Sequence, residues 1–293
     1  MRVLEPHYFR QHKKAKPKKL SKKHRLLITG MLVASVLAVG YVLFGQELNP
    51  GSPRPANREN NSTETAPTEE KPKTLKQFTA EQFKNSYSSY RYPNTEPITD
   101  PPTITGNEAA DARIRQIAEK RGYKLTSRPV ASIVKTEEPG LEGDDLIQPN
   151  ALIAWQQLKN AAIKDGITLK LTSAYRSIEY QRTLFLRRMQ ANGVNVARVL
   201  EGFADDEIEA ILSRAALPGY SRHHTGYTID LSCNGVGLEA FRGTACYAWL
   251  SKNNFENVKK FGWVPSYPEG VGDVGPEPES WEYVWVGTNA TYE

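Results

Sequence analysis

The sequence predicts an α+β fold, a small antiparallel sheet flanked by helices, preceded by one transmembrane helix and a disordered linker. Three observations lead to it. The C-terminal part mixes helical and alternating apolar patterns without the strand–helix–strand rhythm of a parallel sheet. An uncharged apolar run follows a Lys-rich N-terminus. A stretch rich in Pro, Ser, Thr, Asn and Glu separates that run from the mixed part.

The N-terminal region is strongly basic. Residues 1–25 carry ten Lys and Arg against one acid, Glu5, which leaves 28 basic and 32 acidic residues in the rest of the chain. The pI near 9.0 therefore reflects a tail. We expect this cytoplasmic tail to set topology and to contact anionic lipid headgroups, and we expect no nucleic-acid partner; a nucleic-acid-binding arm is the alternative.

Residues 26–45 are expected to be a transmembrane anchor, because about 20 apolar residues span a bilayer. A cleaved signal peptide is the alternative, but its core is about 7–15 residues long and a small-residue cleavage site follows it. No convincing site of that kind is present. The positive-inside rule then places the N-terminus inside and the rest of the chain outside the cytoplasmic membrane, as a single-pass protein.

Residues 46–104 are expected to be an extracytoplasmic linker. Residues 49–74 have almost no large apolar side chains to bury, and Pro and charge extend such a chain. The Tyr- and Pro-rich residues 78–104 either pack on the following domain or stay loose. The two cysteines, Cys233 and Cys246, lie outside the cytoplasm, where an even pair usually forms a disulfide. Catalytic or metal-binding cysteines would need partners that the sequence does not offer.

The domain is expected over residues 105–293. Apolar residues recur at helical spacing in several segments, and Gly122 and Gly166 end the first two of them. Asn150 is the expected cap of the second. Helices are expected over 105–125, over 150–167, through Tyr180 to Met189, through Ile208 to Leu212, and over 244–262. Alternating patterns predict strands over 168–177, 226–233 and 281–287.

The segment "SRHHTGYTIDL", Ser221–Leu231, carries the chemistry. Catalytic zinc usually takes three protein ligands from His, Asp, Glu or Cys. His223 and Asp230 are candidates, and Gly226 between them would let the chain approach an ion closely. One His and one Asp alone are weak evidence. The adjacent His224 is the only other histidine beyond residue 45, and neighbours on a strand point to opposite faces.

"PGYSRHHTGYTIDL" resembles the zinc-binding segment of the VanY-type D-alanyl-D-alanine carboxypeptidases, peptidoglycan metallopeptidases of the hedgehog/D,D-peptidase-like fold. "SAYRSIEYQ", "KKFGW" and "ESWEYVWVG" resemble other segments of this family, in the same order. The resemblance implies that His223 and Asp230 are zinc ligands and that Glu279 is the general base. It also implies that Arg176 binds the substrate carboxylate or the developing oxyanion, and that Gln181 and Ser221 add polar contacts. An ion pair that holds the fold is the alternative role for Arg176.

The chain departs from the family pattern at the third ligand, where Glu282 replaces a histidine. Glu282 as an oxygen ligand restores a set of three, but two carboxylates weaken the polarisation of bound water and favour a harder metal such as Mn²⁺ over Zn²⁺. Arg222 stands where many relatives have Glu, and Val284 where many have Arg. The pair Glu277–Pro278 offers another alignment of the base, but the distance from Glu279 to Trp281 fits directly.

These expectations combine into one function. We expect a monomeric, membrane-anchored bacterial metallopeptidase that cleaves D-amino-acid-containing peptidoglycan stem peptides with a metal-activated water. The alternative is an inactive peptidoglycan-binding or scaffold module that lost zinc when Glu282 replaced the histidine. Carboxypeptidase and endopeptidase activities both remain open.

Overall fold

The computed structural model describes residues 73–272 and 274–293. The helices are α2 (Ala80–Ser89), α3 (Glu108–Lys120), α4 (Pro149–Lys164), α5 (Ile178–Ala191), α6 (Val196–Glu201), α7 (Asp205–Leu212), α8 (Ala245–Lys259) and α9 (Thr288–Thr291). The strands are β1 (Thr95–Pro97), β2 (Ser127–Pro129), β3 (Val134–Lys135), β4 (Leu146–Ile147), β5 (Leu169–Ser173), β6 (Thr228–Cys233), β7 (Trp263–Tyr267) and β8 (Glu279–Trp285). Two 3₁₀-helices complete the set, η1 (Arg222–Thr225) and η2 (Leu238–Gly243).

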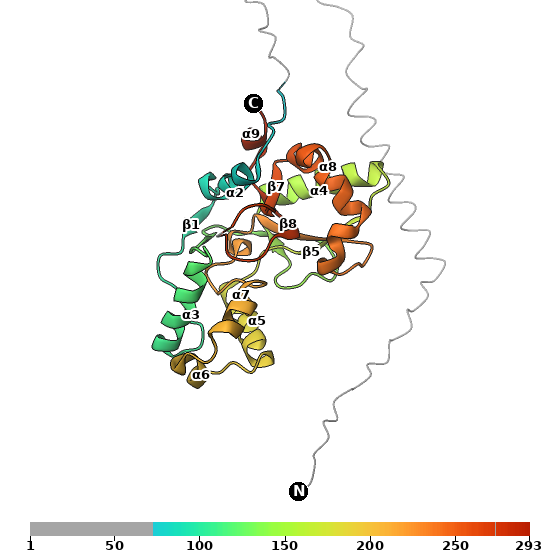
Figure 1. Cartoon of the computed structure of the whole chain (residues 1–293). Helices are drawn as coiled ribbons and strands as arrows, with labels where there is room; N and C mark the ends of the chain where they lie inside the picture. The colour runs from blue at the N-terminus through green and yellow to red at the C-terminus, as the bar shows by residue number, and fades with distance from the viewer. Residues whose placement is uncertain (1–72, 273) are drawn as a thin grey trace, which may run out of the picture. The chain divides into compact units, whose positions relative to one another are not determined.

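The central sheet has four antiparallel strands in the order β5-β6-β8-β7 (Figure 1). Two small antiparallel ladders, β1 with β2 and β3 with β4, lie outside it. This arrangement confirms the predicted mixed fold with a small antiparallel sheet and flanking helices. The strands expected over 168–177, 226–233 and 281–287 correspond to β5, β6 and β8, although β8 begins earlier, at Glu279.

Strand β7 was not expected from the sequence. Pro265 sits in its middle, and proline inside an apolar run argues against a central strand because it lacks an N–H. In the structure β7 is the edge strand of the sheet and pairs only with β8. All five of its residues are buried, because other segments cover this edge.

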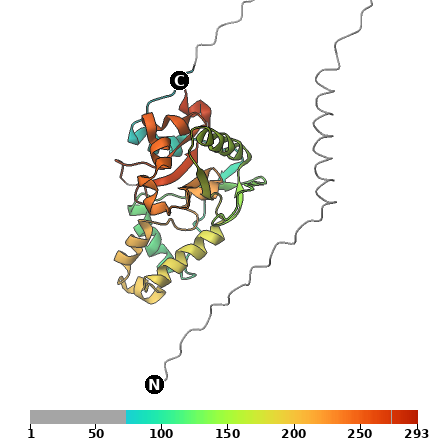
Figure 2. The ribbon, with the colours of Figure 1, turned by 90° about the vertical axis from the view of Figure 1, so that its right-hand side faces the viewer.

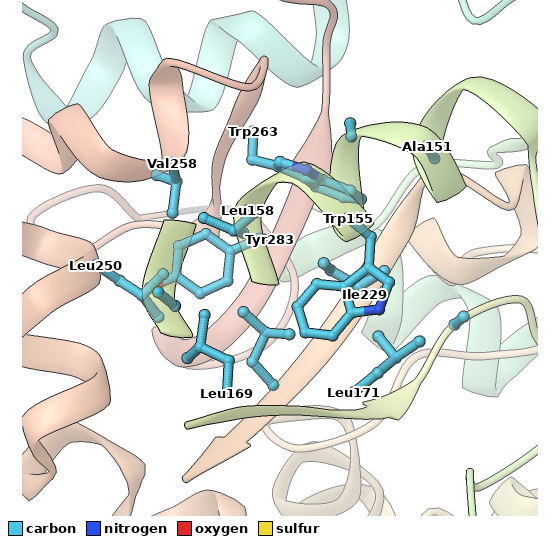
Figure 3. Close-up of a cluster of buried hydrophobic side chains, with 14 of the residues drawn as sticks. Ala151, Trp155, Leu158, Leu169, Leu171, Ile229, Leu250, Val258, Trp263 and Tyr283 are labelled. Atoms are coloured by element: carbon cyan, nitrogen blue, oxygen red, sulfur yellow. The ribbon is translucent and has the colours of Figure 1, made fainter. Parts of the chain in front are cut away.

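The main core lies between the sheet and helix α4 (Figure 3). Ala151, Trp155, Leu158 and Ala162 recur at helical spacing and are fully buried, as the apolar stripe predicts. They pack against strand side chains from β5, β6 and β8, and Leu250 and Val258 of α8 close the cluster. The expected cap is corrected: α4 begins at Pro149, with Gln148 as its N-cap, because proline is favoured in the first turn of a helix.

A second core joins helices α3, α5, α6 and α7, which lie together at the end away from the C-terminus (Figures 1 and 2). Buried Asp111 of α3 ties the incoming chain to this group. Its carboxylate accepts hydrogen bonds from the backbone N–H of Ile104 and from both the N–H and the hydroxyl of Thr105. These bonds fix where the chain enters α3.

The N-terminal segment from residue 73 packs on the domain. Thr79 caps α2 in a capping box with Gln82, and Phe83 of α2 packs against Val264, Val284 and Val286. Val284, one of the departures noted above, is thus a core residue under α2. The structure therefore extends the domain to the N-terminal side of the expected boundary at residue 105.

The transmembrane anchor expected over residues 26–45 lies outside the described residues, as do the basic tail over 1–25 and the first part of the linker. Within residues 73–272 and 274–293, no helix has the length and apolar character needed to cross a membrane.

The predicted disulfide is confirmed. Cys233 ends β6 and Cys246 lies in the first turn of α8, and the two are bonded with their Cα atoms 5.8 Å apart. The bond connects the strand that carries Asp230 to a helix that covers the sheet.

Candidate metal site and cleft

His223 lies in η1, directly before β6, and is 1% exposed. Its Nδ1 is 2.5 Å from the carbonyl oxygen of Ala174, at the end of β5, so Nδ1 carries the proton. A backbone carbonyl that fixes the imidazole in this way leaves the other nitrogen free to bind. Nε2 points to two carboxylates, 3.2 Å from Glu282 Oε2 and 3.3 Å from Asp230 Oδ1.

Asp230 and Glu282 are direct partners across the β6–β8 pair. Like charges opposite each other destabilise a sheet, and a buried carboxylate costs several kcal/mol unless it is paired. Both side chains are nonetheless almost fully buried. Positive charge offsets this cost: Arg176 pairs with Asp230, and His223 contacts both carboxylates.

Glu279 reaches the same region through a β-bulge. Tyr267 pairs with Glu279 and Pro265 with Tyr283, so β8 contributes two more residues than β7 over this stretch. In a regular strand, residues three apart point to opposite faces, but a bulge re-aims side chains. Glu279 and Glu282 therefore line one cavity together.

The charges in this group separate the two glutamates. Burial and the nearby Glu282 and Asp230 carboxylates raise the pKa of Glu279 well above its ordinary value. Burial also raises the pKa of Glu282, but the hydrogen bond and charge of His223 lower it more, to about 2. The pKa values of the two glutamates are therefore shifted in opposite directions. Two carboxyl groups with separated pKa values are typical of acid–base sites.

The same carboxylates also shift the pKa of His223. Burial and the Arg176 charge lower its pKa, but Asp230 and Glu282 more than offset them and raise it to about 9. In the absence of another cation, a protonated imidazole would neutralise part of the pair.

The three side chains fit a divalent metal. One ligand atom from each of His223, Asp230 and Glu282 lies within 4.8 Å of the others. Asp230 Oδ1 and Glu282 Oε1 are buried without a hydrogen-bond partner, and such atoms are normally satisfied by a partner or an ion. One imidazole nitrogen and two carboxylate oxygens are donors that both zinc and manganese accept.

A cavity of about 390 Å³ opens onto Asp230 and Glu282 of this trio. Its wall includes Glu279, Trp281 and Arg176, together with three further arginines, Arg188, Arg214 and Arg242. The cavity therefore joins a buried acidic cluster to guanidinium groups that can bind a free carboxylate.

Comparison with known proteins agrees with this geometry. The sequence model of VanY, D-alanyl-D-alanine carboxypeptidase, matches residues 144–288, which contain the trio, Glu279 and Arg176. These residues belong to the VanY family. The putative carboxypeptidase YodJ of Bacillus subtilis is 31% identical over 148 residues, 49% of this chain and 48% of YodJ. The chain thus spans about half the length of this curated relative.

Two solved structures are similar. The LdcB LD-carboxypeptidase is 28% identical, with a TM-score of 0.42 over 54% of this chain and 67% of that chain. A mutant of the VanY D,D-pentapeptidase from a VanB-type vancomycin resistance cassette, in complex with Zn(II), is 24% identical, with a TM-score of 0.39 over 54% of this chain and 85% of that chain. Family membership rests on the match of residues 144–288.

Arg176 forms the ion pair considered from the sequence and also lies at the cavity. One guanidinium N–H group pairs with Asp230 Oδ2, and Nε donates to Ser173 Oγ at 2.9 Å. The side chain also lines the cavity. A guanidinium has five N–H donors, so the remaining ones are available to an acceptor group in the cleft.

His224 holds neighbouring backbone groups in place, and these contacts exclude it as a metal ligand. Its Nδ1 donates to the carbonyl of Arg176 at 2.7 Å, and its Nε2 accepts from the N–H of Gly219 at 2.9 Å. Burial lowers its pKa to about 4, so it stays neutral. From the sequence, His224 was set aside as a ligand because neighbours on a strand point to opposite faces. In the structure it lies in η1, a 3₁₀-helix, and it is not a ligand because both of its ring nitrogens are already hydrogen-bonded.

Three further residues named from the sequence have contacts within the protein. Gln181 is buried and donates to the carbonyl of Ala216 at 2.7 Å, which ties α5 to the segment after α7. Ser221 is buried as the N-cap of η1. Neither lines the cavity. Gly226 has φ +75°, and a Cβ there would meet Gln148 Cγ at 3.0 Å, so its role is to end η1 against Gln148.

Two features of the site were missed from the sequence. The bulge in β8 has one sign in the sequence. Glu279 and Glu282 are three residues apart, so they can share a site only if the strand between them is irregular. Trp281 was expected only to pack, yet it also forms part of the cavity wall.

Proposed function

We propose that this chain is a metal-dependent peptidase that removes D-amino acids from peptidoglycan stem peptides, as a carboxypeptidase of the D-alanyl-D-alanine type. One observation carries the proposal. At the base of a cleft, a buried imidazole and two buried carboxylates converge, and two of the carboxylate oxygens have no hydrogen-bond partner. Membership of the VanY family agrees with this activity.

His223, Asp230 and Glu282 would hold the ion. A divalent metal bound there would supply a polarised water as nucleophile. Glu279 would take a proton from the nucleophile and return it to the leaving amine, and a raised pKa suits a group that exchanges a proton in both directions. Arg176 would bind the substrate carboxylate with the donors that Ser173 and Asp230 leave free.

The proposal includes location. The uncharged residues 26–45 and the basic residues before them would anchor the chain in the bacterial cytoplasmic membrane, with the peptidase domain outside and facing the cell wall.

Metal content tests the proposal. The full chain, purified without chelators or metal-affinity tags, is expected to carry about one zinc or manganese ion by elemental analysis. Glu282→Ala is expected to lose the metal and the hydrolysis of stem peptides together, because it removes one of three ligands. Glu277→Ala is the matched control: Glu277 also lines the cavity, but it pairs with Arg121 and should leave metal and turnover unchanged. A result in which Glu277→Ala loses activity and Glu282→Ala keeps it would overturn the assignment.

A second candidate is a peptidoglycan-binding module without a metal. The observation that favours it is the pKa of His223, raised to about 9, because a protonated imidazole can neutralise the two carboxylates in place of an ion. In that case the chain takes up no metal after zinc is added, and Glu282→Ala leaves the affinity for stem peptides unchanged.

A further inference from the structure

Arg222, directly before the candidate ligand His223, is buried without an acidic partner. It is 7% exposed, and no carboxylate of residues 73–272 or 274–293 lies within ion-pair distance of it. A buried guanidinium needs other compensation. Two aromatic rings supply it: the guanidinium carbon lies 4.0 Å from the ring centroid of Tyr87 and 4.0 Å from that of Tyr267. A cation between two rings is favoured most where water is excluded.

The two rings come from different parts of the chain. Tyr267 ends β7, whereas Tyr87 belongs to α2, in the N-terminal segment outside the residues that match the VanY family. Helix α2 is fixed over β7 by Phe83 and by its capping box. Tyr87 is therefore held in place on Arg222 by contacts independent of the site.

Arg222 also connects the two aromatic rings to the strand pair that carries Glu282, the third candidate ligand. Its Nη1 donates to both the carbonyl and the hydroxyl oxygen of Ser266, the latter at 3.1 Å. Ser266 is fully buried in β7, opposite the bulge of β8 that carries Glu282. A hydrogen bond from its hydroxyl is among the causes that lower the pKa of the Glu282 carboxylate. Because the Ser266 hydroxyl oxygen accepts from Arg222, its proton is free to turn toward Glu282.

We propose that the N-terminal segment completes the metal site from behind: Tyr87 clamps Arg222, Arg222 orients Ser266, and Ser266 holds the Glu282 carboxylate in the position required of a ligand. Tyr87 and Arg222 are positioning residues in this relay, and neither contacts the ion. The inference rests on the proposed function, because it assumes that Glu282 is a ligand. It adds that a segment outside the family-matching domain sets the metal affinity of this chain.

Zinc affinity of the full chain tests the relay. Tyr87→Ala is expected to weaken zinc binding about 10- to 100-fold, the range seen when a supporting partner of a ligand is removed. Tyr87→Phe keeps the ring face and is expected to retain the wild-type affinity. Tyr90→Ala is the matched control, because Tyr90 also contacts the Tyr92 ring but packs on Trp285 and not on Arg222. The measurement is a competition titration with a chromogenic chelator, using zinc alone.

A purely structural role would predict something different. Removal of either tyrosine would then lower the melting temperature to a similar extent and leave zinc affinity unchanged in both variants. If the wild type binds zinc and Tyr87→Ala binds it equally well, the relay is wrong and the proposed function stands.

A second measurement decides the case in which the wild type binds neither zinc nor manganese, which overturns the proposed function. In chelator, the melting temperatures of Tyr87→Ala, Glu282→Gln and the double variant form a thermodynamic cycle. Non-additive shifts show that Tyr87 and Glu282 are coupled through Arg222 and Ser266 without a metal. Additive shifts overturn the relay as well.

Discussion

Glu282 changes the charge of the candidate metal site. A trio of one neutral imidazole and two carboxylates carries two negative charges, which match a divalent cation and leave its bound water less polarised than two imidazoles and one carboxylate would. In the metal-free site the hydrogen bond and charge of His223 lower the pKa of Glu282 to about 2, although burial opposes this. Glu282 is therefore ionised before a metal binds, whereas His223, with its pKa raised to about 9, must lose a proton to become a ligand.

Glu279 gives the sharpest prediction at this scale. Glu279→Gln keeps the shape of the side chain but removes the group that exchanges a proton. We expect kcat on a peptide ending in D-alanyl-D-alanine to fall about 10²- to 10⁴-fold, with KM and bound metal unchanged. Steady-state kinetics with elemental analysis checks this. Glu239→Gln, a replacement in the exposed part of the cavity wall, should behave as wild type. Unchanged turnover in Glu279→Gln would remove Glu279 from the mechanism.

The resemblance to the VanY family predicted the trio, but it did not predict the surroundings of these residues. His223, Asp230 and Glu282 follow from the order of the motifs, and the cross-strand pairing of Asp230 with Glu282 brings them together. Gln181 and Ser221 stood at family positions yet are buried away from the cavity. Nothing in a local motif tells which distant segment covers a side chain, and the burial of these two depends on such segments.

At the scale of elements, the bulge in β8 and the edge position of β7 were the least predictable features. Both depend on pairing between segments rather than on local propensity, which is why proline in β7 pointed away from a strand. The helices with regular apolar stripes, α3, α4 and α7, were predicted closely because burial of one face determines them.

Asp111 gives a stability prediction for the entry into α3. Asp111→Asn removes the charge and turns one acceptor into a donor that faces backbone N–H groups, at a cost of about 1–3 kcal/mol in the free energy of unfolding. Burial raises the pKa of Asp111, but hydrogen bonds from Thr105 and Ile104 lower it below its ordinary value of 3.8. Its stabilising contribution is therefore complete above the unfolded-state pKa and is lost as the pH falls through the lower folded-state value.

Urea unfolding at several pH values measures both effects. The stability difference between wild type and Asp111→Asn should be largest near neutral pH and should shrink in acid. Asp206→Asn, at an exposed acid of α7, should show no such difference. A difference that grows in acid would contradict the assignment.

The disulfide gives a prediction for β6 and α8. Replacement of Cys233 and Cys246 together by alanine is expected to lower the free energy of unfolding by about 3 kcal/mol, because the bond restricts a short loop in the unfolded chain. Denaturant titration of this variant, and of the wild type with and without reductant, measures it. The variant should match the reduced wild type, and equal stability of all three samples would show that the bond contributes nothing.

For the whole molecule, the proposed anchor gives a prediction by fractionation. The full chain is expected in the membrane pellet after a high-salt wash, because residues 26–45 would insert in the bilayer. A variant that lacks residues 1–45 is expected in the soluble fraction. Release of the full chain by salt would mean that only the basic tail binds the membrane. An N-terminus beyond residue 45 in the mature protein would mean that a signal peptide is cleaved.

The two ends of the described chain meet at one point. Leu75 forms an isolated antiparallel bridge with Tyr292, Lys76 N–H donates to the Thr291 carbonyl, and Glu293 N–H donates to the Thr74 carbonyl. A force that pulls on the chain at residue 73 would therefore act first on these few hydrogen bonds and would break them one after another. The next link is α2 and its Tyr87. Mechanical tension from the N-terminal side would act on the back of the candidate metal site before it reached the central sheet.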